Sequence, residues 1–94
     1  ADNLWMSTCH QRDAMTLHFT WKPEWPAVKK ILPLIEAKLA PFDARPHWAK
    51  MFTMQPSRIK QLYEKMPDDH SLLKQYDPHG QFRNDFLNTN IYGA

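Results

Sequence analysis

Residues 14–22 read Ala-Met-Thr-Leu-His-Phe-Thr-Trp-Lys, and this stretch decides the predicted fold class. Apolar and polar side chains alternate along it with a period of two, and several of them are aromatic or β-branched. That pattern is typical of a β-strand with one buried face. Leu17, Phe19 and Trp21 lie on the apolar face, so we expect this face to contact the core.

His18 falls on the opposite face of this expected strand, together with Thr16 and Thr20. On a sheet with one solvated face, such a polar row is ordinary and meets only water. On a sheet that covers a cavity, the same row would point hydrogen-bonding groups into the cavity. The alternation by itself leaves both interpretations open.

The segments on either side complete the predicted fold. Residues 3–8 are expected to form a shorter strand, which pairs most simply with residues 14–22 as an antiparallel hairpin. A helical apolar stripe, with Pro33 inside it, follows between Pro26 and Pro41. The expected fold is therefore α+β, with antiparallel strands and three helices packed on one face.

Two more helices are expected in the C-terminal half. One begins at Pro56 and covers residues 57–66, where Pro67 is expected to end it. The other begins after Asp68, which is a good N-cap residue. The tail from Asn88 onward is expected to fray.

Composition excludes several classes of partner. The chain has 94 residues and a formal net charge of +2, with no basic stripe, so it is not expected to bind nucleic acid. No apolar run approaches the roughly 20 residues that a membrane-spanning helix needs, so no membrane partner is expected. The single cysteine, Cys9, allows no internal disulfide and fits a reducing compartment, which predicts a cytoplasmic protein.

The sequence also lacks the usual motifs for metals, nucleotides and serine nucleophiles. The five histidines show no His-x3-His spacing, and there is no Cys-x2-Cys pair, so no metal is expected. With only two glycines, the chain carries neither a phosphate-binding loop nor a Gly-x-Ser-x-Gly elbow. If a nucleotide cofactor is used, another segment must bind it.

The stretch at residues 44–52, Ala-Arg-Pro-His-Trp-Ala-Lys-Met-Phe, is unusual for a turn because it gathers aromatic rings, cations and a proline. It is the connection between the long helix and the C-terminal helices. Lys50 is the candidate functional group in it. From the residues alone, both Lys50 and His18 are equally well explained as exposed polar side chains.

Several motifs occur together in one order. Residues 45–52 closely resemble the His-Trp-Gly-Lys signature of the aldonolactone and alditol oxidases, with Ala49 in place of the usual glycine. Residues 77–87 resemble the Asp-Pro-x-Gly-x-Phe-x-Asn-x-x-Leu segment of the same family. Residues 3–7 and 17–21 are most similar to its alditol, or xylitol, branch. The resemblance extends from about residue 2 to residue 87.

This resemblance implies a flavoprotein of the vanillyl-alcohol oxidase type. Residues 1–94 would then be the C-terminal portion of a substrate, or cap, domain, and FAD would be bound mainly by an N-terminal domain of the same polypeptide. The expected reaction is oxidation of a polyol such as xylitol at a terminal alcohol, with O2 converted to H2O2. The isolated fragment is expected to be inactive.

The resemblance also assigns roles to three residues. His18 and Lys50 correspond to catalytic residues, while Thr20 and Lys50 correspond to substrate-binding residues. An imidazole can take up the alcohol proton near neutral pH, and an ammonium can donate hydrogen bonds to hydroxyls. No residue of this chain is assigned to cofactor binding. His47 and Trp48 are expected to support the turn that carries Lys50.

Two alternatives stay open. An aldonolactone oxidase of the D-arabinono-1,4-lactone type would differ only in its substrate. A non-catalytic α+β binding module would instead use the exposed sheet face as its partner surface.

Overall fold

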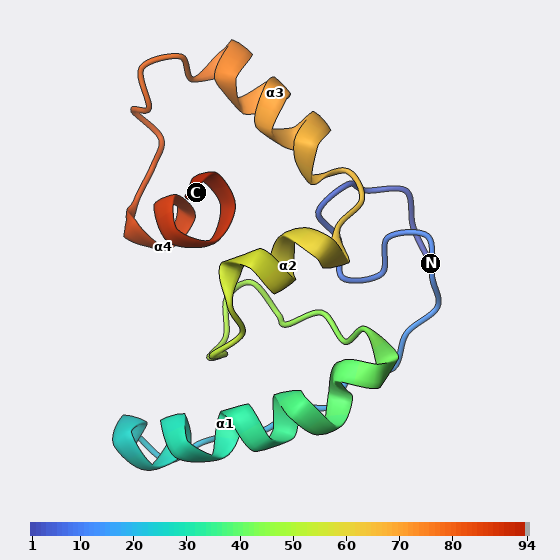
Figure 1. Cartoon of the computed structure of the whole chain (residues 1–94), viewed down its shortest axis with the longest axis vertical. Helices are drawn as coiled ribbons and strands as arrows, with labels where there is room; N and C mark the ends of the chain where they lie inside the picture. The colour runs from blue at the N-terminus through green and yellow to red at the C-terminus, as the bar shows by residue number, and fades with distance from the viewer. Residues whose placement is uncertain (94) are drawn as a thin grey trace.

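The computed structural model describes residues 1–93, and every regular element in this range is helical (Figure 1). The elements are α1 (Trp25–Leu39), η1 (Ala40–Phe42), α2 (Pro56–Leu62), α3 (Met66–Tyr76), α4 (Asp85–Leu87) and η2 (Asn88–Tyr92). Within residues 1–93, extended pairing is limited to one isolated parallel bridge between Asp2 and His10. No helix in this range is both long enough and apolar enough to span a membrane.

The predicted α+β fold with antiparallel strands is therefore wrong. Residues 14–22 form no strand, and no segment among residues 1–93 pairs with them. Their expected core face is largely open, because Met15 is 84%, Leu17 51% and Phe19 46% exposed. Alternation shows which side chains share a face, but a strand also needs a neighbour for its backbone hydrogen bonds.

The expected hairpin with residues 3–8 is also wrong, because the N-terminal segment closes on itself. The Asp2 N–H donates to the Cys9 carbonyl at 3.0 Å, and the Gln11 N–H donates to the Asp2 carbonyl at 2.7 Å. The Ser7 hydroxyl donates to the Asp2 carboxylate at 2.6 Å. These bonds define the N-terminal loop, residues 2–11, which leaves no edge for residues 14–22.

The long helix was predicted correctly. α1 runs as one helix through Pro33, with a second proline, Pro26, in its first turn, where the missing N–H costs nothing. Val28 and Leu32, four residues apart on one face, are buried. Figure 1 shows α1 apart from α2 and α3, so the expected packing of three helices on one face is wrong.

The core lies between α2, the start of α3 and η2. Its buried members are Ile59, Leu62, Tyr63, Met66 and Ile91. Ile59 is fully buried and Tyr63 nearly so, and they are the two largest side chains buried to that degree. Side chains from the N-terminal loop and from residues 48–54 pack around this cluster, so the core joins both halves of the chain.

Three sequence-based expectations for the C-terminal half need correction. α2 ends at Leu62 rather than Met66, and α3 already begins at Met66. The reason is Pro67, which lies in the first turn of α3, where proline is favoured, instead of terminating α2. The tail does not fray, because Asn88–Tyr92 form a π-helical turn that buries Ile91.

Candidate functional site: the groove beside α1

A groove of about 1170 Å³ lies between residues 14–21, the C-terminal half of α1 and residues 44–55. We call it the α1 groove. Its walls are mainly apolar side chains, among them Leu17, Phe19, Trp21, Leu32 and Phe52. An apolar concave surface with a few polar groups is the usual form of a small-molecule site.

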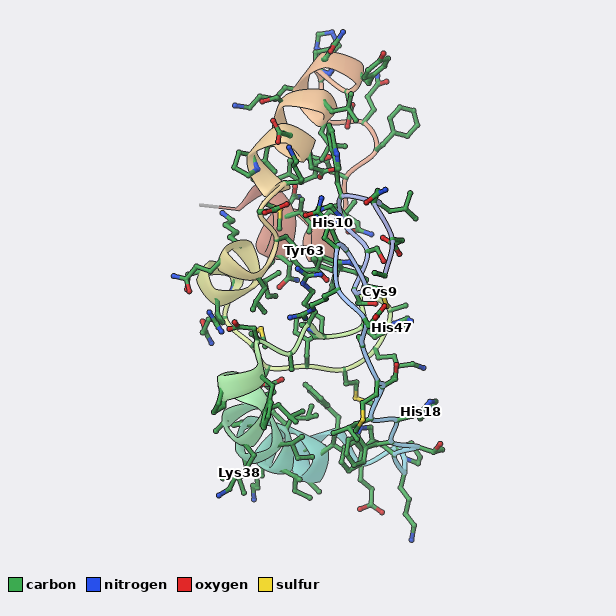
Figure 2. All side chains as sticks on the ribbon, turned by 90° about the vertical axis from the view of Figure 1, so that its right-hand side faces the viewer. Cys9, His10, His18, Lys38, His47 and Tyr63 are labelled. Atoms are coloured by element: carbon green, nitrogen blue, oxygen red, sulfur yellow. The ribbon has the colours of Figure 1, made fainter. Side chains whose placement is uncertain are left out.

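The structure brings the three sequence-predicted site residues to this one groove. His18, Thr20 and Lys50 all line it, although they come from segments about 30 residues apart. All three side chains are exposed. Figure 2 shows His18 and His47 along the same side of the molecule, with Lys38 on the opposite side. Their roles in catalysis and substrate binding stay predictions.

The turn that carries Lys50 is held by His47. The Ala49 N–H donates to His47 Nδ1 at 3.0 Å, and the Lys50 N–H donates to the His47 carbonyl at 3.1 Å. Nδ1 is therefore an acceptor, which places the proton of the neutral ring on Nε2. The expected supporting role of His47 is confirmed.

Trp48 anchors the same turn to the core. Its Nε1 donates to the Met6 carbonyl at 2.8 Å, and its ring lies 5.1 Å from the ring of Tyr63. Trp48 is partly buried, and a tryptophan in such a position usually satisfies its N–H in this way while its rings pack against apolar surface. The expected supporting role of Trp48 is confirmed as well.

Arg45 is a residue whose importance sequence reasoning missed. Its Nε donates to the Leu62 carbonyl at 3.0 Å, and its guanidinium lies 4.8 Å from the centre of the Tyr63 ring. Its Nη1 lies 3.2 to 3.4 Å from three more carbonyl oxygens, those of Ser7, Thr8 and His10. Burial lowers the pKa of Arg45, with a further contribution from the Arg12 charge. One side chain thus ties the N-terminal loop to the end of α2.

A second unexpected contact joins α1 to residues 50–54, which we call the Lys50 segment. The Glu36 carboxylate accepts two hydrogen bonds from Thr53, one from the backbone N–H and one from the hydroxyl, both at 2.6 Å. Glu36 also lines the α1 groove. No local pattern could reveal a pair separated by 17 residues, because each residue alone looks like an ordinary polar side chain.

The C-terminal motif, residues 77–87, forms a hydrogen-bonded turn and a helix cap. The Asp77 carboxylate accepts hydrogen bonds from the backbone N–H groups of Gln81 and Phe82. Gly80 lies in this turn with φ of +66°, a conformation that favours glycine. Asn84 caps α4 by accepting a hydrogen bond from the Leu87 N–H at 2.9 Å.

Neither a candidate metal cluster nor a glycine in the groove lining is present among the described residues. Among residues 1–93, no group of three or more histidine, cysteine or carboxylate side chains could hold a metal ion. Gly80 and Gly93, the two glycines of the chain, are not among the residues that line the groove.

Residues 1–90 match the D-arabinono-1,4-lactone oxidase family, so the chain belongs to this family. Among its relatives, the alditol oxidase of Streptomyces sp. (strain IKD472 / FERM P-14339) is 38% identical over 86 residues. The family resemblance inferred from the motifs is thereby confirmed. The aligned region makes up 92% of this chain but 21% of the relative, so the chain spans about a fifth of that protein's length.

Proposed function

We propose that this chain is the C-terminal portion of the substrate domain of an FAD-dependent oxidase. The whole protein would oxidise polyols such as xylitol at a terminal alcohol and convert O2 to H2O2. The observation that carries the proposal is that His18, Thr20 and Lys50 all line the α1 groove. Family membership and the similarity to an alditol oxidase support it.

Lys50 and Thr20 would bind and orient the substrate. An ammonium donates up to three hydrogen bonds, which suits neighbouring hydroxyls of a polyol. The Thr20 hydroxyl both donates and accepts, so it can bond to a further hydroxyl. The positive charge of Lys50 would also stabilise negative charge that develops on the reacting oxygen.

His18 would take the alcohol proton. Oxidation of a primary alcohol to an aldehyde removes a proton from oxygen and a hydride from carbon. Bound FAD would supply the hydride acceptor and would be reoxidised by O2. An imidazole in the same groove as Lys50 is suited to hold the proton, since the group can act as a base near neutral pH.

The groove fits the ring of a flavin better than its phosphates. Its walls combine apolar side chains with His18, Thr20 and Lys50, which suits a planar ring with a polar edge. With neither glycine in the lining, the groove lacks the close backbone approach that phosphates need. We therefore place the phosphate-binding residues in an N-terminal FAD-binding domain of the same polypeptide.

Exposed apolar surface supports the view that the chain is part of a larger unit. Met15, Leu17 and Phe19 leave about half or more of their surface open. Such a patch usually marks an interaction surface. The isolated chain would then be inactive, because the flavin and the remaining walls of the site would come from the rest of the protein.

A second candidate function is oxidation of an aldonolactone, which the description of the matching family favours. The same groove and the same three side chains would serve it, because a lactone ring also presents hydroxyls. The experiment below separates the two substrates.

The proposal is tested on the full-length flavoprotein. Its absorbance spectrum reports bound flavin, and peroxide formation on xylitol, sorbitol and aldono-1,4-lactones identifies the substrate class. Lys50→Ala and His18→Ala should each lower kcat/KM by about 100-fold or more, with flavin content unchanged. Lys38→Ala, a lysine on the opposite side of the molecule, is the matched control. Unchanged kinetics in both variants would refute the site.

A further inference from the structure

We propose that Glu36 is a positioning residue that holds the Lys50 segment at the correct distance from α1. This inference rests on the proposed function, because it assumes that Lys50 binds substrate in the α1 groove. It adds a residue on a different helix that controls the site without contacting the reacting atoms.

The contact itself is specific in geometry. Each carboxylate oxygen of Glu36 has its own donor, Oε1 the Thr53 N–H and Oε2 the Thr53 hydroxyl, both at 2.6 Å. Hydrogen bonds to an ionised carboxylate are shorter and stronger than neutral ones. Both groups are partly shielded from water, which strengthens the pair further.

Glu36 provides the polar link between α1 and this part of the protein. Among residues 1–93, the two bonds to Thr53 are the hydrogen bonds that join a side chain of α1 to another segment. No salt bridge among residues 1–93 includes an α1 residue. Two hydrogen bonds to separate oxygens of one carboxylate fix the position of Thr53 relative to α1.

The Lys50 segment depends on this link. Residues 51–54 belong to no helix or strand. Within them, in the described structure, the Thr53 N–H is the backbone group with a hydrogen-bond partner, and that partner is Glu36. Thr53 follows Lys50 by three residues, so losing the Glu36 contact would leave the backbone of residues 51–54 without a hydrogen bond directly beside the turn that His47 and Trp48 hold.

Glu36 is also one of the residues that line the α1 groove. Glu36 lines one wall, on α1, while Lys50 and Phe52 line the facing segment. Thr53, the partner of Glu36, directly follows Phe52 in the chain, so the two bonds join α1 to the segment that forms the other wall. A polyol held by the Lys50 ammonium would be bound more weakly if the walls moved apart, because small displacements of positioning groups lower productive binding.

The test uses the full-length flavoprotein with the variants Glu36→Ala, Glu36→Gln and Thr53→Ala. Glu36→Ala should raise KM for the polyol about tenfold or more, with a smaller effect on kcat and unchanged flavin content. Glu36→Gln should restore KM to within about threefold of the wild-type value, because an amide can accept from the N–H and donate to the hydroxyl. Glu64→Ala, a glutamate bonded to His10 outside the groove, is the matched control.

A double variant separates positioning from a general structural defect. If Glu36 acts through Lys50, then Glu36→Ala in a Lys50→Ala background should lower kcat/KM by less than about twofold further. An independent, multiplicative loss would overturn the inference. So would equal defects in Glu36→Gln and Glu36→Ala, because the charge rather than the position of the group would then matter.

A measurement that does not need activity distinguishes failure of this inference from failure of the proposed function. In amide NMR spectra of the full-length protein, Glu36→Ala should shift the Thr53 and Lys50 resonances, and Glu64→Ala should leave them in place. If the wild-type protein oxidised neither polyols nor lactones, the proposed function would fail. Unchanged Thr53 and Lys50 resonances in Glu36→Ala would independently overturn the positioning role.

Discussion

Replacing Arg45 by methionine should release the N-terminal loop, residues 2–11, from the end of α2. Methionine fills a similar volume but offers no donor. The change therefore removes the bond to the Leu62 carbonyl and the contacts with the three loop carbonyls. It also removes the stacking of the guanidinium on Tyr63.

The size of the effect follows from the geometry. Nη1 carries two hydrogens but faces three carbonyl oxygens at 3.2 to 3.4 Å, so it supplies about two bonds rather than three. With the Nε bond, about three bonds at about 1 kcal/mol each are lost. The stacking contact contributes about 0.5–1 kcal/mol more. The loop should therefore open about 3–4 kcal/mol more easily.

Hydrogen exchange measures this local opening directly. The Asp2, His10 and Gln11 amides are hydrogen-bonded within the loop, so their protection reports its closure. In the full-length protein, Arg45→Met should lower their protection by about 100-fold or more. Arg45→Lys should have an intermediate effect, because lysine keeps the charge but lacks the planar fork.

Arg83→Met is the matched control, because Arg83 stacks on Tyr92 at 3.8 Å and belongs to a different contact. It should leave the loop amides unchanged. If Arg45→Met changed the protection of the three amides by less than about threefold, Arg45 would not hold the loop, and the reasoning from its carbonyl contacts would be refuted.

Two further predictions concern the core and the loop. Ile59→Ala should lower the free energy of unfolding by about 2–5 kcal/mol, because Ile59 is fully buried; Ile31→Ala, at a half-exposed position, should cost much less in the same denaturation experiment. The Ser7 hydroxyl, the largest influence, holds the pKa of Asp2 below its usual 3.8. The ionised carboxylate therefore stabilises the loop above about pH 4, and this contribution is lost as pH falls through the lowered pKa. A carboxyl carbon NMR titration should find a higher Asp2 pKa in Ser7→Ala, and an unchanged value would contradict the role of the hydroxyl.

What could be predicted from the sequence depended on how local the determining interactions were. α1 was predicted correctly through Pro33 because a helix satisfies its own backbone and needs only a periodic apolar face. The helix boundary at Pro67 was wrong because proline fits both the end of one helix and the start of the next.

The strand prediction for residues 14–22 was wrong because a strand depends on a non-local partner. Their alternation describes side chains, whereas a strand is defined by a partner, and none is present among residues 1–93. The structural roles of Arg45 and Glu36 could not be predicted from the sequence for the same reason. Arg45 acts on carbonyls more than 30 residues away, and Glu36 acts on Thr53 across 17 residues. The motif resemblance supplied His18, Thr20 and Lys50, but it could not supply Arg45 or Glu36, because their contacts are long-range.

The burial of Tyr63 limits the stability of the fold at alkaline pH. Its hydroxyl has no hydrogen-bond partner among the described residues, and burial raises the pKa of Tyr63 above its usual 10.0. In the unfolded chain the phenol loses its proton near pH 10, while in the folded chain it keeps it. Above that pH the unfolded state binds fewer protons, so the stability of the fold declines as pH rises. Tyr63, whose ring contacts both Arg45 and Trp48, thus also makes the core sensitive to strong base.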